Sequence, residues 1–360
     1  MKQRAKEKET AVKKAEILAP VGAMEQLYAA VRCGADAVFE LPTLFAVRTA
    51  DAFARGGVAV LGGLGIDVLS FGSEDPSLPE KIADIKRSEP EAVTEKVRGN
   101  LAAGMAHARA WGEAAAEYLG VPMDAVNAPN MILGAEYIRA IGELGLNMEI
   151  QTVERRGGYH DLQPGEAEFA SATAIRAAMA QGRMSDVLRW VPAEAGEILQ
   201  SAGGMHAPDD LLLARLRMMT EAELAALPDV AEGLEKRVKK CAAEASGREE
   251  LLEMLKCKRY TRARLSRLTA HALLGLTAEL AQRHPLPEYA RLVGMRDDAR
   301  PLLRELKARA TLPIVSDAPS LAGNEIFQLE CCATDLRALQ CDRPEERRSG
   351  QEFTKKFVRV

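Results

Sequence analysis

Three residues at the predicted start of a helix have side chains suited to binding an anion. Ser171, Thr173 and Arg176 follow the turn-forming segment Gln163-Pro164-Gly165. The first turn of a helix offers free backbone N–H groups and the positive end of the helix dipole, to which two hydroxyls and a guanidinium would add donors. This arrangement would suit the phosphates of ATP. The alternative is that Ser171 only caps the helix and Arg176 is a solvated helix residue.

Gly72 and Asn130 are further candidates for binding a nucleotide. Gly72 stands at the end of an apolar run, where the lack of a Cβ lets a ligand approach the backbone closely. Asn130 carries both a donor and an acceptor on one side chain. Each residue also has a structural interpretation, which is a tight turn at Gly72 and an Asx-turn at Asn130.

A basic stretch in the second half of the chain could bind an RNA backbone. It contains no acidic residue and has the basic residues Lys256, Lys258, Arg259, Arg262, Arg264 and Arg267. On a helix, Arg262 would lie on the same side as Lys258 and Arg259, so these three could follow a line of phosphates. A second basic cluster lies upstream at Lys236, Arg237, Lys239 and Lys240. The alternative is a solvated basic surface, since the net charge of the whole chain is −4.

The elements that position these residues indicate two units of different class. Short apolar runs at 16–19, 36–41, 66–72 and 148–153 alternate with helical patterns, which predicts parallel strands and a partial α/β domain over residues 15–185. Residues 186–360 are predicted to form a mainly helical domain, with a small βαβ-like appendage built from strands near 289–294 and 312–317. Residues 1–14 are expected to form a disordered leader.

Composition excludes several classes of protein. No stretch approaches the length of apolar residues that a membrane span needs, and the charged opening segment lacks the apolar region of an export signal. We therefore expect a cytoplasmic protein with no membrane or DNA partner. The six cysteines include no CxxC pair and lie near no histidine at metal-ligand spacing, so we expect reduced, structural thiols and no protein-held metal site.

Short motifs occur along most of the chain in one consistent order. They are Phe39-Glu40-Leu41-Pro42, Phe71-Gly72-Ser73-Glu74, Pro129-Asn130-Met131, Gly158-Tyr159-His160-Asp161, Ser171 to Arg176, Lys258 to Arg264, His271 to Gly275, Leu312 to Val315 and Ala333 to Leu336. As a set, they resemble the tRNA(Met) cytidine acetate ligases of the nucleotidyltransferase superfamily. This resemblance implies an incomplete Rossmann-like nucleotidyltransferase domain followed by the mainly helical C-terminal domain, which would bind tRNA.

The resemblance also implies an activity and its ligands. Members activate acetate with ATP, which we expect to carry Mg²⁺, to form acetyl-adenylate. The acetyl group then passes to the N4 of the wobble cytidine of elongator tRNA(Met). By the same resemblance, Gly72 and Asn130 would contact the adenine and ribose. The family's arginine would be Arg155 or Arg156, and the sequence leaves both open.

The chain departs from the family at its catalytic motif. The superfamily opens on a strand that runs into an HxGH motif, yet the histidines His107, His160, His206, His271 and His284 never form that pattern. Residues 16–38 instead resemble the opening unit of a collagenase-type peptidase family, although nothing later continues such a barrel. Losing preorganised donors to a transition state costs roughly two to three powers of ten in rate for each donor, so we predict weak or absent catalysis and name no catalytic residue.

Overall fold

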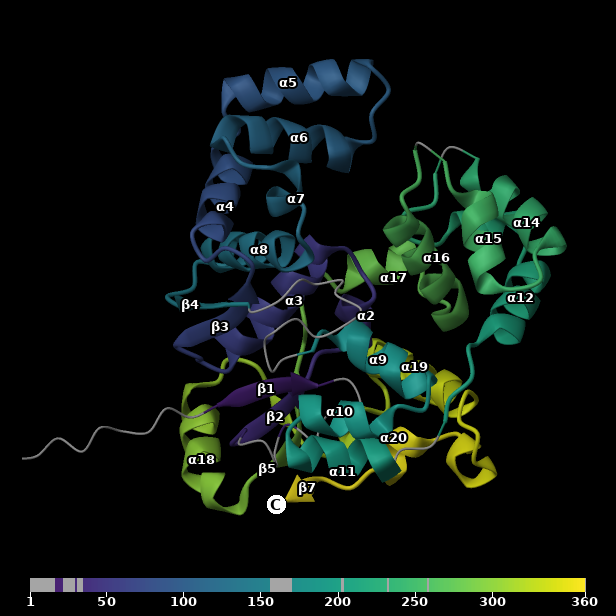
Figure 1. The fold of residues 1–360 in the computed structure, drawn as a ribbon. Coiled ribbons are helices and arrows are strands. Elements are labelled where there is room, and N and C mark those ends of the chain that lie inside the picture. Colours follow the sequence, from purple (N-terminus) through teal and green to yellow (C-terminus); the bar gives the residue numbers. More distant parts are fainter. Residues whose placement is uncertain are drawn as a thin grey trace, which may run out of the picture.

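A computed structural model describes residues 17–21, 30, 35–155, 170–201, 204–231, 233–257 and 259–359 of the chain. Most of these residues are helical, and two small sheets lie among the helices (Figure 1). The mixed α/β class is therefore confirmed. Within these ranges, every helix is too short or too polar to cross a membrane.

The larger sheet contains strands from both ends of the chain. Its strands are β1 Leu18–Val21, β2 Ala37–Glu40, β5 Ala290–Met295, β6 Ile314–Val315 and β7 Val358–Arg359. β1 and β2 pair in parallel, β2 pairs antiparallel with β5, and β6 and β7 pair in parallel with β5. Apolar residues of this sheet pack against the helix α18, Arg300–Arg309, in a core that includes Phe39 and Leu292.

The smaller sheet carries the first candidate site. It consists of β3, Val68–Ser73, and β4, Glu149–Glu154, which pair in parallel with Gly72 opposite Val153. Helices α3, Ala50–Gly63, and α8, Pro129–Glu143, pack on each other, and their shared core reaches Met148 beside β4. The strands predicted at 66–72 and 148–153 are confirmed, and both end on the same edge of this sheet.

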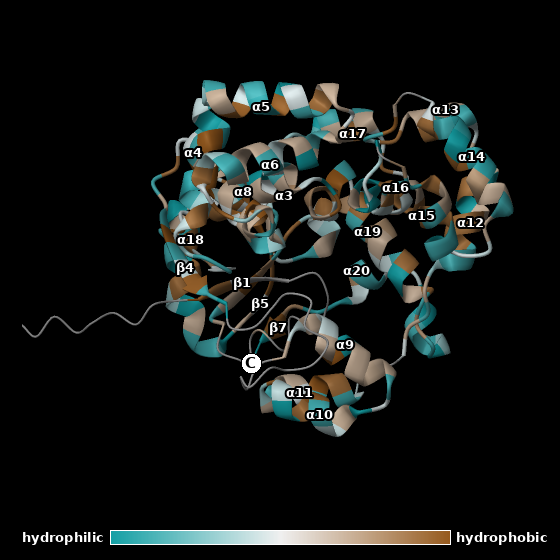
Figure 2. Cartoon of the chain, turned by 45° about the horizontal axis from the view of Figure 1, so that its top comes forward, coloured by the Kyte–Doolittle hydropathy of each residue, from teal (hydrophilic) through white to brown (hydrophobic). Residues whose placement is uncertain are grey.

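A helical unit separates β3 from α8. It contains α4 Leu78–Ser88, α5 Glu91–Ala102, α6 His107–Leu119 and α7 Met123–Val126. Its core includes Ile82, Val93, Ala115 and Met131, the last of which belongs to α8. Helix α5 buries little of its surface, and Figure 2 shows it at the outer edge with hydrophilic and weakly hydrophobic colours along much of its length.

A series of short helices begins after residue 170, before the region 186–360 that was predicted to be mainly helical. They are α9 Ala172–Ala180, α10 Met184–Trp190, α11 Ala193–Ser201, α12 Asp209–Met218, α13 Glu221–Ala225, α14 Leu234–Glu244, α15 Arg248–Leu255 and α16 Arg262–Leu274. Leucines from α12 to α16 share one core, which includes Leu216, Leu251 and Leu268. Gly275 ends α16 in the left-handed conformation, in which glycine has no Cβ to strain.

The C-terminal elements join this helical group to the larger sheet. Helix α19, Glu325–Ala338, packs through Phe327 on Leu44 and Phe45 of α2, Thr43–Ala46, and α17, Ala278–Arg283, contributes Ala281 to the same core. The β5–α18–β6 unit matches the predicted βαβ-like appendage. It pairs through β5 with β2, however, so its strands share a sheet with the N-terminal segment, and the domain boundary near residue 185 stays a prediction.

Candidate functional site

Gly72 and Arg155 lie side by side where β3 and β4 end. The backbone N–H of Arg155 donates to the carbonyl of Ser73 at 2.9 Å, which extends the ladder by one step. A Cβ placed on Gly72 would come within 3.3 Å of Cγ of Arg155, so the arginine side chain covers the glycine. Gly72 lies inside β3, so the tight-turn interpretation of this residue is wrong. The carboxyl ends of parallel strands form the usual ligand crevice of α/β folds.

Asn130 reaches the same strand ends from the first turn of α8. Its Nδ2 donates to Oε1 of Glu74 at 2.6 Å, and Nε of Arg155 lies 3.9 Å from that same oxygen. Asn130 lies inside the first turn of α8, after the N-cap residue Ala128, so it does not form the predicted Asx-turn, and its side chain bonds to Glu74. Asn130 and Arg155 come together around the carboxylate of Glu74, and Gly72 lies against the Arg155 side chain. We call these four residues the strand-end cluster.

A second carboxylate follows the strand-end cluster in the sequence. Oδ1 of Asp75 accepts the backbone N–H of Ser77 at 2.8 Å, and this hydrogen bond holds the pKa of Asp75 below its usual range. Ser73 is fully buried, and its hydroxyl donates to the carbonyl of Asp75 at 2.9 Å. Carboxylates at this edge of the sheet would repel phosphate groups and would accept hydrogen bonds from hydroxyl or amino groups of a ligand.

Ser171 caps α9, as one of the two interpretations of this motif predicted. Its hydroxyl oxygen accepts the N–H of Ala174 at 3.0 Å, and its own backbone is extended, as is usual for a capping residue. Thr173 is half-buried and Arg176 is exposed. Figure 1 shows α9 apart from β3 and β4, so these three residues do not join the strand-end cluster among the described residues. Arg156 and His160 lie outside the described residues.

The basic stretch is not one continuous helix. Helix α15 ends at Leu255 and α16 begins at Arg262, so the helical spacing assumed for Arg259 and Arg262 is wrong. Lys258 lies outside the described residues. Lys256 and Arg259 are exposed in the connection between the two helices.

Several arginines of the basic stretch form ion pairs or hydrogen bonds with other residues of the same chain. Arg262 pairs with Glu249 and Glu253 of α15, the latter at 2.9 Å. Arg264 donates through Nε to the carbonyl of Asp229 at 2.9 Å, and Arg267 lies 3.4 Å from the carboxylate of the same residue. These contacts fix α16 to its neighbours. RNA phosphates would therefore have to compete with them.

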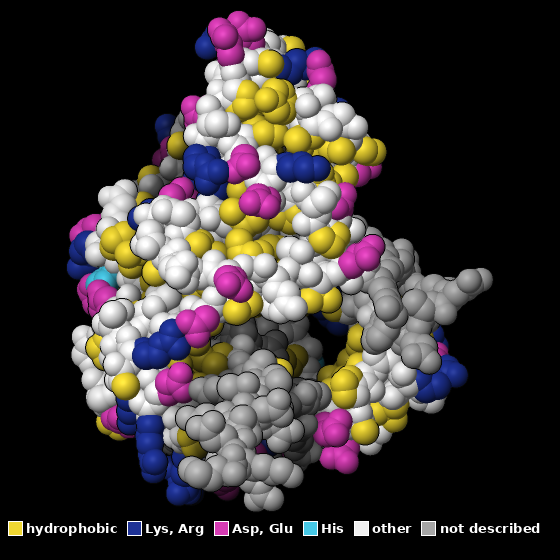
Figure 3. All heavy atoms as spheres, turned by 90° about the vertical axis from the view of Figure 1, so that its left-hand side faces the viewer, with side chains coloured by type: hydrophobic (Ala, Val, Ile, Leu, Met, Phe, Trp, Pro, Cys, Tyr) yellow, Lys and Arg dark blue, Asp and Glu magenta, His cyan; other side chains and the backbone are white. Residues whose placement is uncertain are grey.

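The upstream basic cluster divides into two pairs of residues with different surroundings. Arg237 donates to the carbonyl of Met254 at 2.7 Å, and Lys239 donates to that of Arg217 at 2.5 Å, so both help to end neighbouring helices. Lys236 and Lys240 are exposed and stand four residues apart on α14. Figure 3 shows the opposite side of the molecule, near β3 and α18, where basic and acidic side chains are interspersed over the visible described atoms.

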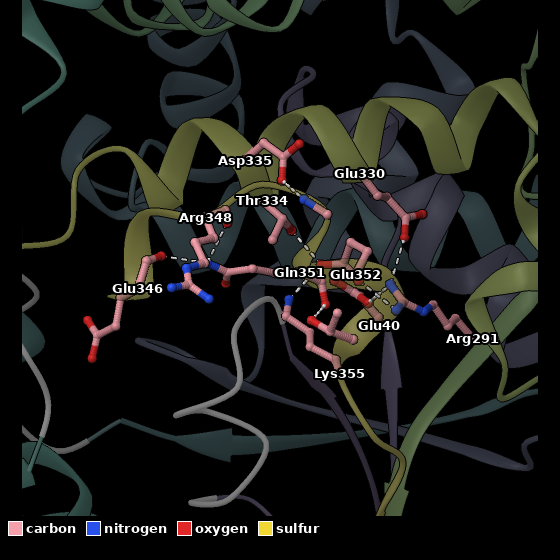
Figure 4. A network of polar contacts seen from close by, with 12 residues as sticks. Glu40, Arg291, Glu330, Thr334, Asp335, Glu346, Arg348, Gln351, Glu352 and Lys355 are labelled. Atoms are coloured by element: carbon pink, nitrogen blue, oxygen red, sulfur yellow. Dashed lines mark hydrogen bonds and ion pairs between the residues drawn. The ribbon is translucent and has the colours of Figure 1, made fainter. Parts of the chain in front are cut away.

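A buried cluster of charged side chains was not predicted from the sequence. The guanidinium of Arg291, in β5, contacts three carboxylates from distant parts of the chain (Figure 4). The distances are 2.7 Å to Glu40 of β2, 3.3 Å to Glu330 of α19 and 2.6 Å to Glu352 of α20, Gln351–Thr354. Lys355 adds a second cation at 2.5 Å from Glu352. We call these five residues the buried ion network.

Burial sets the protonation of the buried ion network. It raises the pKa of Glu330 to about 8, so this carboxyl is mostly protonated at neutral pH. The neighbouring cations instead hold the pKa of Glu352 below its usual range, although burial alone would raise it. Burial also raises the pKa of Glu40, although Arg291 opposes that shift, so the carboxyl groups of this network do not all titrate alike. A signal was available in the sequence, because Glu40 and Arg291 each interrupt an apolar run.

The described residues hold no group of three or more His, Cys, Asp or Glu side chains that could bind a metal ion. Cys241, Cys257, Cys331, Cys332 and Cys341 are free thiols. Burial raises the pKa of the Cys331 thiol to about 11, so this residue is not a reactive thiolate at neutral pH.

The fold and the order of the motifs define a nucleotidyltransferase. A family model described as HIGH Nucleotidyl Transferase matches residues 24–352, and the chain belongs to that family. Within it, the chain belongs to the tRNA(Met) cytidine acetate ligases. The relative of that name from Caldanaerobacter subterraneus is 31% identical over 324 residues, which are 86% of this chain and 81% of the relative. The one from Bacillus subtilis is 32% identical over 332 residues, 88% of this chain and 80% of the relative.

Solved structures show the same relationship. The crystal structure of Thermotoga maritima TmcAL in its apo form has a TM-score of 0.82 and 28% identity, and the match covers 92% of this chain and 86% of that one. The same protein bound with alpha-thio ATP has a TM-score of 0.81 and 27% identity, with 93% and 87% covered. The recognition made from the motifs is therefore confirmed.

Proposed function

We propose that this chain is a slow ATP-dependent acetate ligase that forms N4-acetylcytidine at the wobble position of elongator tRNA(Met). The observation that carries the proposal is the strand-end cluster. Gly72, Asn130 and Arg155 are far apart in sequence, yet Asn130 and Arg155 meet at the Glu74 carboxylate and Gly72 contacts Arg155 at the carboxyl ends of two parallel strands. The relatives named above carry the ligase name, and one solved relative was bound with an ATP analogue.

The proposed reaction has two balanced steps. A carboxylate oxygen of acetate attacks the α-phosphorus of ATP, so acetyl-adenylate forms and pyrophosphate leaves. The N4 amine of cytidine then attacks the acetyl carbonyl, a C–N bond forms, AMP leaves and the amine loses a proton. In this account the strand-end cluster binds the nucleoside of ATP, and Ser171, Thr173 and Arg176 at the start of α9 face its phosphates. Mg²⁺ would accompany those phosphates.

The proposed architecture follows from the same family. An incomplete Rossmann-like nucleotidyltransferase domain would bind ATP, and the mainly helical C-terminal domain would bind tRNA in the cytoplasm. Lys256, Lys258, Arg259, Arg262, Arg264 and Arg267 would contact RNA phosphates. Lys236 and Lys240 support this placement, because both are exposed on α14 and have no hydrogen bond or ion pair within the described residues. Binding through phosphates would weaken steeply as salt rises.

A second function is favoured by the missing HxGH motif. A chain without those histidines could keep its affinity for tRNA and ATP while losing acetate activation, which would make it a tRNA-binding homologue without activity. Exchange of labelled pyrophosphate into ATP separates the two functions. Exchange that depends on acetate supports the ligase, whereas exchange equal to that of a blank without protein refutes it.

Binding to RNA is tested separately from chemistry. In gel shifts with elongator tRNA(Met) over a salt series, the logarithm of the association constant should fall linearly with the logarithm of the salt concentration. Replacing both Lys236 and Lys240 with glutamine should lower the affinity and reduce the salt dependence. An affinity that ignores salt would refute binding through the phosphate backbone.

A further inference from the structure

Glu74 stands at the centre of the strand-end cluster, although neither the motifs nor the relatives assign it a role. It follows β3 directly, and its Oε1 accepts from Nδ2 of Asn130 at 2.6 Å. The same oxygen lies 3.9 Å from Nε of Arg155, beyond the end of β4. Its second oxygen, Oε2, is buried and has no hydrogen-bond partner in the part of the chain that the structure describes. One carboxylate thus links the first turn of α8 to the ends of both strands.

The contact with Glu74 decides which way the amide of Asn130 points. A carboxylate only accepts hydrogen bonds, so the NH₂ group of Asn130 must face it and the carbonyl oxygen must face away. That carbonyl can then accept only from a donor, such as an amino group of the base or a ribose hydroxyl. Without Glu74, the side-chain amide of Asn130 could flip and present its NH₂ group to the ligand instead of its carbonyl oxygen.

The charge at this place selects the part of ATP that can lie here. Glu74 and Asp75 follow each other at the end of β3, and the pKa of Asp75 is held low by its hydrogen bond with the backbone of Ser77. Phosphate groups would be repelled by this pair. The nucleoside is neutral and carries hydroxyl and amino donors.

We infer that Glu74 is a positioning residue for ATP, whose carboxylate orients the amide of Asn130 and holds Arg155 so that the cluster binds the nucleoside. The inference rests on the proposed function, since it assumes that ATP binds at the strand ends. Glu74 acts through Asn130 and Arg155, so its loss should weaken ATP binding through the coupling between these side chains.

A double-variant cycle with the full chain tests this coupling. Dissociation constants for ATP would be measured by calorimetry for the natural chain, Glu74→Ala, Glu74→Gln, Asn130→Asp and the pair Glu74→Gln with Asn130→Asp. Glu74→Ala should weaken ATP binding on the order of ten-fold, as for loss of a hydrogen bond to a charged group. Glu74→Gln should change it by less than about three-fold, because its carbonyl still accepts from Asn130.

The decisive result is rescue. Asn130→Asp alone places two carboxylates against each other and should weaken binding on the order of ten-fold or more. In the double variant, the amide of the new glutamine donates to the new aspartate, which restores the hydrogen bond with its direction reversed. The double variant should therefore bind ATP more tightly than Asn130→Asp, which independent sites would not do.

Controls separate the possible failures. Glu154→Gln removes a negative charge at the end of β4, from an exposed side chain with no hydrogen bond or ion pair among the described residues, and should leave ATP binding unchanged. Thermal unfolding of each variant shows whether it folds. Unchanged ATP binding by Glu74→Ala, or a double variant no better than Asn130→Asp, would overturn the inference alone. No ATP binding by the natural chain would refute the proposed function and the inference with it.

Discussion

Replacing Arg291 with methionine should remove a large part of the stability of this protein. Methionine keeps an unbranched side chain that can still pack near the ring of Phe327, whose centroid lies 5.0 Å from the guanidinium carbon. The substitution deletes the cation that contacts Glu40, Glu330 and Glu352. Only Lys355 would then remain among these carboxylates.

The magnitude follows from burial. Arg291 is 8% exposed, and its partners Glu330 and Glu352 are 2% and 1% exposed, so the carboxylates left behind would stay buried. Removing one partner of a buried ion pair costs about 3–5 kcal/mol. Because a protonated Glu330 carries no charge, it leaves no unpaired buried anion when Arg291 is removed. The expected loss in the free energy of unfolding is therefore at the lower end of this range, about 3 kcal/mol. Domains are stable by about 5–15 kcal/mol in total.

Arg309→Met is the matched control. Arg309 of α18 pairs with Asp67 at 2.5 Å, a contact as close as those of Arg291, but the two side chains are 43% and 73% exposed. An exposed ion pair contributes far less to stability than a buried one, because solvent screens the two charges. Urea unfolding of both variants at pH 7, followed by circular dichroism, compares the two losses. Equal losses, or a loss below about 1 kcal/mol for Arg291→Met, would refute the argument from burial.

Three further predictions concern single residues. Burial raises the pKa of Glu330 from 4.5 to about 8, so the natural chain binds an extra proton when folded and should lose stability relative to Glu330→Gln as pH rises through this window. Urea midpoints from pH 5 to 9 measure the difference, and parallel curves would contradict it. Ser171→Ala should cost about 1 kcal/mol through the lost cap. Ser171→Asp should keep the cap yet weaken ATP binding, and intact ATP affinity would mean that the start of α9 does not face phosphates. Gly134→Ala should destabilise α8 by about 1–3 kcal/mol, because the new Cβ would lie 2.5 Å from the ring of Phe71. Gly142→Ala, which meets no atom within 4 Å, should stabilise the same helix by about 0.5–1 kcal/mol. Thermal unfolding should thus show shifts of opposite sign for the two glycines.

Local sequence patterns predicted where the strands lie better than they predicted which strands pair with each other. The apolar runs that become β2, β3, β4 and β5 are strands in the structure, because a buried strand needs little more than a short apolar stretch between turns. The antiparallel pairing of β2 with β5 joins residues some 250 positions apart in the chain, and no local signal specifies it. The five residues of the buried ion network depend on that pairing.

The candidate site was predicted in part for the same reason. The motifs predicted Gly72 and Asn130 and left Arg155 and Arg156 open. The position of Glu74 between Asn130 and Arg155 depends on the three-dimensional fold, which the motifs do not specify. The composition of the basic stretch favours helix, and this pattern predicts one helix over its length. Thr261 instead caps a new helix at Arg262, and the glutamates that pair with Arg262 come from the preceding helix, which spacing within the stretch could not indicate.

Formation of N4-acetylcytidine is the most direct test of the proposed ligase. Elongator tRNA(Met) without the modification would be incubated with the full chain, ATP, Mg²⁺ and acetate, then digested to nucleosides and analysed by mass spectrometry. The account predicts slow accumulation of N4-acetylcytidine that requires both ATP and acetate and that falls with Asn130→Asp. The absence of N4-acetylcytidine from the complete mixture, in a preparation that still binds this tRNA, would contradict the ligase and leave the tRNA-binding homologue.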